Sequence, residues 1–254
     1  YRPYKPKRKT RATVAIAKGL EPLADIILAQ DLTKPVEEYA RDFVSEEKGV
    51  KDVDVAIGGA KDIIAERISD DANLRKVLRE IIAKKAVIKS TWDEEADEHK
   101  TYENYKDFSG DVAKIPSHRI LALNRGEKEK CLKVSVEINP KLTLTEIEKA
   151  YKKDCEFTDQ IMLDTIQDSY DRLLFPSLER ECRTSLTDRA NEQAIKMFEV
   201  NLKPLLLQAP LKNNVIMGYD PGYYNGCKIA VIDKKGDVLD TAVVYPTPPQ
   251  NKVE

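Results

Sequence analysis

Hydrophobic side chains recur at helical spacing through most of the chain before residue 200. The apolar residues of 36–43 stand at i, i+3, i+4 and i+7, the spacing of one face of a helix. Gly58-Gly59 should interrupt the next such segment, and Asp71 is a typical helix N-cap. The same spacing returns in further segments at 60–68, 74–82, 161–173 and 178–198. We predict helices in all of them, with their apolar faces in the core.

Several residues predict where the later helices begin and end. Ser117, which follows a proline, and Thr143, which stands three residues before a glutamate, are typical of helix starts. Pro176 should end one helix, because proline lacks the N–H that a helix interior needs, and Ser177 should cap the next. Pro204 is expected to kink or end that long helix.

One stretch inside this helical region predicts a strand. Leu132, Val134, Val136 and Ile138 alternate with polar residues, as in a strand with one buried face. The preceding segment, 90–114, is polar and is expected to be an irregular connector. The first fold prediction is therefore a multi-helical domain that contains a small β element.

At residue 213 the pattern changes to β. Apolar runs at 215–219, 228–232 and 238–245 predict three strands, and the turn residues of 233–237 join the last two as a hairpin. We place a domain boundary near residue 212, which gives a helical domain over 1–212 and a second domain over 213–254. Three strands make a poor domain by themselves, so we expect the second domain to be incomplete here. The chain opens on tyrosine, which also suggests an excerpt of a longer protein.

Composition narrows the class of protein. Charged residues make up 34% of the 254 residues, with a net charge of -2, which is typical of a solvated surface. No apolar run of 18 residues and no signal peptide occur, so we expect no membrane partner and a cytoplasmic location. The scattered cysteines and the two histidines lack metal-ligand spacing, and no glycine-rich phosphate loop is found. We therefore expect no cofactor and no small-molecule substrate.

Charge is unevenly distributed along the chain. The first 20 residues carry seven lysines and arginines and no acid, whereas residues 93–98 carry five acids. A basic arm of this kind is often a footprint for nucleic-acid phosphates. The alternative is a solvated basic segment that packs on an acidic surface of its own domain. The candidate nucleic-acid contacts in the arm are Lys5, Lys7, Arg8, Lys9 and Arg11.

His118 and Arg119 are two further candidates for nucleic-acid binding. They follow Ser117 in the first turn of a predicted helix, where free backbone N–H groups favour anions. Ser117 beside His118 also raises the question of a nucleophile pair. Sequence neighbours on a helix point in different directions, so helix capping by Ser117 is the better interpretation.

Asp220 is the one candidate for metal-dependent catalysis. It ends an apolar run and precedes Pro221-Gly222, the place where ribonuclease H-like folds put their first catalytic carboxylate. Two-metal hydrolysis needs several converging carboxylates, and one aspartate does not supply them. Asp233 and Asp237 lie beyond the far end of the second predicted strand and are read as turn residues. Asp220 is thus either a metal ligand or the acid of a tight turn.

Five stretches of the chain resemble the Tex family of bacterial transcription accessory proteins, and they occur in family order. They are YRPYKPKRKTRATVAIAKGLEPLAD at 1–25, GGAKDIIAE at 58–66, IPSHRILALNRGEKE at 115–129, RLLFPSLERECR at 172–183 and DPG…GCKIAVID at 220–233. The resemblance implies a protein with a helical N-terminal part, a YqgF/ribonuclease H-like domain, helix-hairpin-helix segments and an S1 domain. It further implies that this chain starts inside the helical part and stops after three strands of the YqgF domain.

The chain departs from the family at one turn. After Asp-Pro-Gly and an aromatic residue the family usually has Arg-Thr, and this sequence has Tyr224 and Asn225. Loss of an arginine beside a phosphate-facing turn weakens a nuclease role for Asp220, and the family's YqgF domain is itself regarded as lacking a full catalytic set.

These observations lead to one functional prediction with two alternatives. We expect a mainly α protein followed by the start of a ribonuclease H-like α/β domain. Its expected function is non-catalytic nucleic-acid binding in transcription, with RNA preferred to DNA and the transcription machinery as a further partner. The alternatives are a metal-dependent nuclease or resolvase that uses Asp220, and a protein-interaction scaffold on the transcription machinery.

Overall fold

The computed structural model describes residues 9–209, 211–222, 224–248 and 250–252, and it divides into two compact units between Lys196 and Met197. Lys5, Lys7 and Arg8 lie outside the described residues. We call the described residues up to Lys196 the helical unit and those from Met197 on the strand unit. The predicted boundary at residue 212 lies further along the chain, beyond the end of a helix that starts in the first unit and runs into the second, and it stays a proposal.

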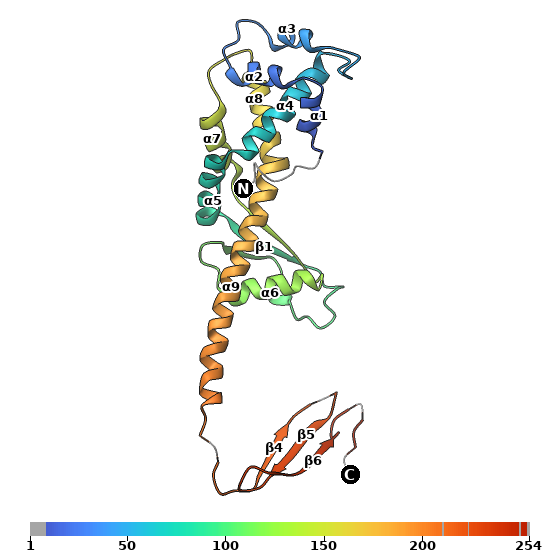
Figure 1. Cartoon of the computed structure of the whole chain (residues 1–254), viewed down its shortest axis with the longest axis vertical. Helices are drawn as coiled ribbons and strands as arrows, with labels where there is room; N and C mark the ends of the chain where they lie inside the picture. The colour runs from blue at the N-terminus through green and yellow to red at the C-terminus, as the bar shows by residue number, and fades with distance from the viewer. Residues whose placement is uncertain (1–8, 210, 223, 249, 253–254) are drawn as a thin grey trace. The chain divides into compact units, whose positions relative to one another are not determined.

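The helical unit is built mainly from α-helices (Figure 1). The α-helices are α1 (Arg11–Ala17), α2 (Glu21–Ala29), α3 (Val36–Ala40), α4 (Val53–Asp70), α5 (Ala72–Lys85), α6 (Ser117–Lys128), α7 (Pro140–Tyr151), α8 (Asp159–Asp168) and α9 (Phe175–Leu206). The shorter helical segments are η2 (Arg41–Phe43), η3 (Glu103–Tyr105) and the π-helical η4 (Ser169–Leu174). The strands are β1 (Val87–Trp92), β2 (Phe108–Asp111) and β3 (Leu132–Glu137), followed in the strand unit by β4 (Ile216–Asp220), β5 (Cys227–Ile232) and β6 (Val238–Val244).

The hydrophobic core of the helical unit forms around α4. Its Ile63, Ile64 and Ile68 are fully buried, and α1, α2, α8 and η4 pack against it. The predicted interruption at Gly58-Gly59 is wrong, because α4 continues through both glycines. Among the described residues, no helix combines the length and hydrophobicity that crossing a lipid bilayer requires.

The helix caps agree only in part with the sequence prediction. Asp71 caps α5 as predicted, since its Oδ1 accepts the N–H groups of Asn73 and Leu74 at 2.8 and 3.1 Å. The caps predicted at Ser117 and Thr143 are wrong. Ser117 is the first residue of α6, so the helix starts where the sequence predicted, but its side chain does not cap the helix and donates to Gln193 on α9. Thr143 is fully buried inside α7, which Asn139 caps.

The break predicted at Pro176 is also wrong, since α8, η4 and α9 follow one another without a loop. A proline inside a helix lacks an N–H and collides with the carbonyl four residues earlier, here that of Arg172. The π-helical segment η4 ends just before Pro176, and at its end Phe175 N–H reaches back five residues to Tyr170 O. We infer that this wider turn accommodates the proline ring. Pro204 lies inside α9, two residues before its end.

The small β element is an antiparallel sheet in the order β2-β1-β3. The strand predicted around Val134 is confirmed as β3. β1 and β2 lie largely in the segment predicted to be a connector. The alternation of β1 is hidden in the sequence, because its inward position Ser90 is polar. That side chain is buried and donates from Oγ to Tyr105 O at 2.7 Å.

The strand unit contains an antiparallel sheet in the order β4-β5-β6, as the three apolar runs predicted. Asp220 pairs in register with Lys228 at one end of the β4–β5 ladder. The turn between β5 and β6 has Gly236 at a φ of 97° and is held by Asp233, whose Oδ1 accepts the N–H groups of Lys235 and Asp237. The interpretation of Asp233 and Asp237 as turn residues is therefore confirmed.

Candidate nucleic-acid interface

The basic arm leads directly into α1, so part of the predicted arm is helical. Thr10 caps this helix by a reciprocal pair of hydrogen bonds with Thr13: Thr10 Oγ1 accepts Thr13 N–H at 3.1 Å, and Thr13 Oγ1 accepts Thr10 N–H at 2.8 Å. Lys9 therefore precedes the cap and Arg11 is the first residue of the helix. Both side chains are exposed, and the cap fixes the backbone that carries them.

A surface groove runs between α1 and α4, and it brings the described cations of the arm together. Lys9, Arg11 and Lys18 line it, with Asp62 as the acidic residue of its wall. Gly58 opens the groove, since a Cβ there would meet no other atom within 4 Å. We call this feature the α1–α4 groove.

The same two helices pack tightly one residue further along α4. A Cβ on Gly59 would overlap Leu20 Cδ1 and come within 3.2 Å of Ala15 Cβ. Leu20 and Ala15 are both buried. Gly59 therefore sets the close approach of α1 to α4, while Gly58 leaves the groove beside it open.

Arg11 also faces acids of its own domain. Burial raises the pKa of Asp62, and Arg172 and then Arg11 oppose that rise. The pKa of Asp168 is lowered, first by the hydrogen bonds that Arg172 donates, with Arg11 and Lys61 as further positive charges. Arg11 thus lies within electrostatic reach of both carboxylates. These two carboxylates fit the alternative interpretation of the arm, in which a basic segment packs on an acidic surface of its own domain.

His118 and Arg119 are exposed in the first turn of α6, as the sequence predicted for that helix start. Pro116 precedes the helix and no side chain caps it. The guanidinium carbon of Arg119 lies 5.4 Å from the centroid of the Phe108 ring on β2, a cation–π contact that holds the arginine over the sheet edge.

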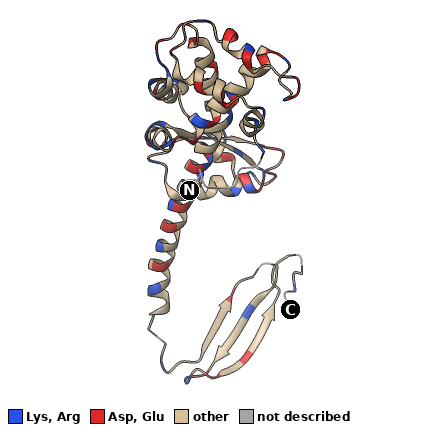
Figure 2. Cartoon of the chain, turned by 45° about the horizontal axis from the view of Figure 1, so that its top comes forward, with Lys and Arg blue, Asp and Glu red and all other residues tan. Residues whose placement is uncertain are grey.

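The structure does not bring the two sets of candidate residues into one site. Figure 1 places α1 beside α2 and α4 at one end of the helical unit, and α6 beside the β1 sheet at the other end. Figure 2 shows lysine and arginine interspersed with aspartate and glutamate over the helices of this unit. A nucleic acid that contacts both sets would therefore have to span the unit.

Asp220 lies at the end of β4, next to a turn whose backbone is closely packed. A Cβ on Gly222 would overlap Gly226 O, and Gly226 itself has a φ of 80°. Cys227, the first residue of β5, is buried behind this turn. Only glycine fits the close approach at 222, which explains the Pro-Gly step after the aspartate.

The hollow beside Asp220 is lined by two charged residues, Asp220 itself and Lys228. It lies over Gly218, Ala230 and Ala242. The described residues contain no group of three or more His, Cys, Asp or Glu side chains that is placed to hold a metal ion. The nuclease hypothesis therefore rests on Asp220 alone.

Sequence reasoning missed two contributors to the α1–α4 groove, Lys18 and Gly58. Lys18 is the C-cap residue of α1, and its Nζ donates to Gly49 O at 3.0 Å. Its distance in sequence from Lys9 concealed that the two line the same groove. The Gly58-Gly59 doublet was a usable signal, since two glycines inside a helical segment often mark close backbone packing.

Two protein-family models match the chain. The model described as Tex central region-like matches residues 31–198, and the one described as Tex protein YqgF-like domain matches residues 214–254. The first covers more than half of the chain.

Individual relatives match the chain over nearly its whole length. An uncharacterized protein of Bacillus subtilis, YdcI, is 46% identical over 100% of this chain and 36% of its own length. Protein tex of Bordetella pertussis is 34% identical over 100% of this chain and 34% of its own length. The human S1 RNA-binding domain-containing protein 1 is 31% identical over 96% of this chain and 26% of its own length. The chain thus spans about a third or less of each of these relatives.

Proposed function

The chain belongs to the Tex family, and from this membership we propose that it contributes non-catalytic nucleic-acid binding, with RNA preferred to DNA, to a transcription accessory protein. A relative in Neisseria gonorrhoeae carries the name transcriptional accessory protein Tex. The name of the human relative refers to an S1 RNA-binding domain in that protein. That this chain prefers RNA is part of our proposal. A cytoplasmic location, a bacterial source and contact with the transcription machinery belong to it as well.

The observation that carries the proposal is the α1–α4 groove. Lys9, Arg11 and Lys18 contribute three cationic side chains along one hollow, against the single acid Asp62. Such an arrangement attracts phosphates and releases their counterions. Gly58 leaves room for a sugar–phosphate backbone to approach α4. The basic residues Lys5, Lys7 and Arg8 directly precede Lys9 in the sequence and would extend the same contact.

His118 and Arg119 are proposed as a second, separate phosphate contact. Both are exposed in the first turn of α6, and Arg119 is held over Phe108. Because the two contacts lie at different ends of the helical unit, a strand long enough to reach both should bind more tightly than a short one.

The experiment is a salt-titrated binding measurement on the full 254-residue chain with single-stranded RNA and duplex DNA. Replacement of Lys7, Arg8, Lys9 and Arg11 by glutamine should weaken RNA binding. The slope of log affinity against log salt should become shallower by about 0.7 for each RNA phosphate that the variant no longer neutralises.

A matched variant separates the groove from general surface charge. Lys51, Lys76, Lys84 and Lys85 are exposed lysines outside the groove, and their replacement by glutamine removes the same charge. The proposal predicts that this second variant keeps most of the affinity. Equal RNA affinity in wild type and the groove variant would refute the groove as the contact and favour a protein-interaction scaffold.

The nuclease alternative has its own test. Magnesium-dependent cleavage of RNA, duplex or junction by a full-length relative, abolished by the equivalent of Asp220→Ala, would support it. Absence of cleavage for every one of these substrates would exclude it.

A further inference from the structure

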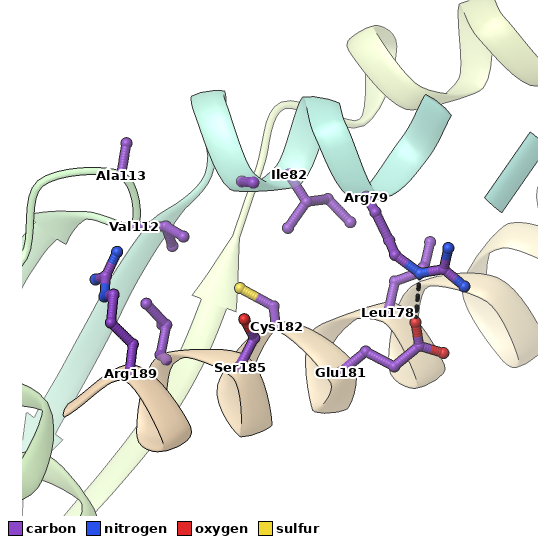
Figure 3. A pocket seen from close by; sticks show the side chains of 11 residues that line it. Arg79, Ile82, Val112, Ala113, Leu178, Glu181, Cys182, Ser185 and Arg189 are labelled. Atoms are coloured by element: carbon purple, nitrogen blue, oxygen red, sulfur yellow. Dashed lines mark hydrogen bonds and ion pairs between the residues drawn. The ribbon is translucent and has the colours of Figure 1, made fainter. Parts of the chain in front are cut away.

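A cavity of about 210 Å³ lies between α5, α9 and the segment that follows β2 (Figure 3). Its wall is mainly apolar and includes Ile82 from α5, Leu178 and Leu186 from α9, and Val112 after β2. Ile82, Leu178 and Leu186 are buried core residues and form its floor, whereas Arg79, Ala113, Ser185 and Arg189 are exposed around its mouth. Aliphatic cavities of about 150 Å³ accept a benzene-sized molecule. The volume here therefore suits one ring or a short chain, and it is too small for a nucleotide.

Each end of the cavity carries an arginine, and the two arginines differ in whether a carboxylate pairs with them. At one end, Arg79 Nε donates to Glu181 Oε2 at 2.8 Å, so both charges are paired. At the other end stands Arg189, beside Val112 and Ala113 in Figure 3. This side chain is exposed, its Nη2 donates to Ile115 O at 3.3 Å, and it makes no ion pair with the part of the chain that the structure describes. A guanidinium has five N–H donors, so most of those of Arg189 are available to a ligand.

Two further polar groups face the cavity from the same helix. In Figure 3 the sulfur of Cys182 and the hydroxyl oxygen of Ser185 both point into the space between α5 and α9. Burial raises the pKa of the Cys182 thiol, which keeps it neutral at pH 7. Cys182 therefore adds a soft apolar surface, and Ser185 adds one hydrogen-bonding group on the Arg189 side.

We propose that this cavity binds a small organic anion, with a carboxylate held by Arg189 and an apolar body of about one ring packed against Ile82, Leu178 and Leu186. The charge preference follows from the unpaired cation at one end, and the size limit follows from the volume. The sequence predicted no small-molecule substrate, and the ligand inferred here is bound without being transformed. The cavity shares no residue with the α1–α4 groove, so the inference is independent of the proposed nucleic-acid contact.

The test uses benzoate as the probe and benzamide as its neutral counterpart, titrated into the full chain with methyl groups observed by NMR. Benzoate should shift the methyl resonances of Ile82 and Val112 saturably. Benzamide should bind about tenfold more weakly, and Arg189→Gln should reduce benzoate affinity by about tenfold with little effect on benzamide. Arg180→Gln, an exposed arginine on α9 outside the cavity, is the matched control and should leave both affinities unchanged.

A second measurement does not depend on a variant. Alkylation of Cys182 by iodoacetamide, followed by mass spectrometry of the wild-type chain, should slow when benzoate is present and slow less with benzamide. The proposal is overturned if benzoate produces no saturable shift at Ile82 and Val112 and no protection of Cys182. It is also overturned if Arg189→Gln binds benzoate as tightly as wild type, because the carboxylate contact would then be absent.

Discussion

Glu179, on α9, accepts the backbone N–H of Val136, on β3, with 2.8 Å between Oε1 and N. One turn further along α9, Arg183 Nη1 donates to Val134 O at 3.1 Å. β3 is an edge strand, and an edge strand leaves backbone groups without a neighbouring strand. Two side chains of α9 therefore take the place of that strand and attach the helix to the sheet.

Removal of the Glu179 carboxylate should weaken this attachment. Glu179→Ala leaves the part-buried N–H of Val136 without its acceptor, and we expect the free energy of unfolding to fall by about 1–2 kcal/mol. Glu179→Gln keeps a carbonyl acceptor and should lose less than half of that. Urea denaturation measures both. Equal stability of the alanine variant and wild type would mean that water replaces the carboxylate.

The glycine pair in α4 gives a second prediction, with opposite signs at adjacent positions. Gly58→Ala adds a methyl group in open space inside a helix, and we expect it to stabilise the chain by about 0.5–1 kcal/mol. Gly59→Ala places a methyl group against Leu20 and Ala15 and should destabilise it by about 1–2 kcal/mol. Thermal unfolding of the two variants under one set of conditions measures the difference. A higher unfolding temperature in both variants would contradict the prediction, because it would show that α1 can shift away from α4 without loss of stability.

The helices were predictable from sequence where their apolar spacing is a local property. The face after Asp71 and the alternation around Val134 appeared as expected, and the segment 36–43 is helical but divided between α3 and the 3-10 helix η2. Predictions failed where tertiary contacts decide the outcome. Pro176 should end a helix by its own chemistry, but the π-helical turn before it lets the helix continue. Ser90 is polar in sequence and is nevertheless buried in β1, where its hydroxyl donates a hydrogen bond to Tyr105 O.

The candidate site was predictable to a similar extent. Lys9 and Arg11 stood out by the local density of charge, and Asp220 by its place at the end of an apolar run. The groove itself was not predictable, because it arises where α1 packs across α4 and brings Lys18 beside Lys9. The place of Gly58 in the groove also depends on this packing, because Gly59 next to it sets the distance between α1 and α4.

Two arginines that share one carboxylate should differ sharply in their effect on stability. The Arg75 side chain is 3% exposed and donates to Glu181, to Ser177 and to the carbonyl of Ser69. The Arg79 side chain is 51% exposed and donates to the same Glu181. Arg75→Ala leaves several part-buried acceptors without a donor and should cost about 2–4 kcal/mol. Arg79→Ala should cost less than about 1 kcal/mol.

Urea denaturation of the two arginine variants tests this contrast, and the Arg79 variant is the matched control for the loss of a positive charge beside Glu181. The m-value should stay constant if both variants unfold in the same cooperative transition. Similar losses for the two variants would mean that burial of Arg75 adds nothing to its ion pair.

Asp97 should make the stability of the helical unit depend on pH in the acid range. Burial acts to raise the pKa of this carboxyl, but the hydrogen bonds it accepts from Tyr102 N, Trp92 Nε1 and Thr101 N prevail, and its pKa lies below the usual value. An unfolded aspartate titrates near about 3.9. The stabilisation is therefore fully present above about pH 4 and is lost as pH falls through the lower, folded pKa.

Fluorescence of Trp92, the single tryptophan, reports unfolding at this loop and so measures the pH dependence. Asp97→Asn should be less stable than wild type at pH 7, with a difference that shrinks in acid, because the wild-type carboxylate is then protonated. The exposed neighbour Glu98 provides the control, and Glu98→Gln should behave as wild type. A stability difference for Asp97→Asn that stays constant from about pH 7 to about pH 3 would contradict the ionic role of Asp97.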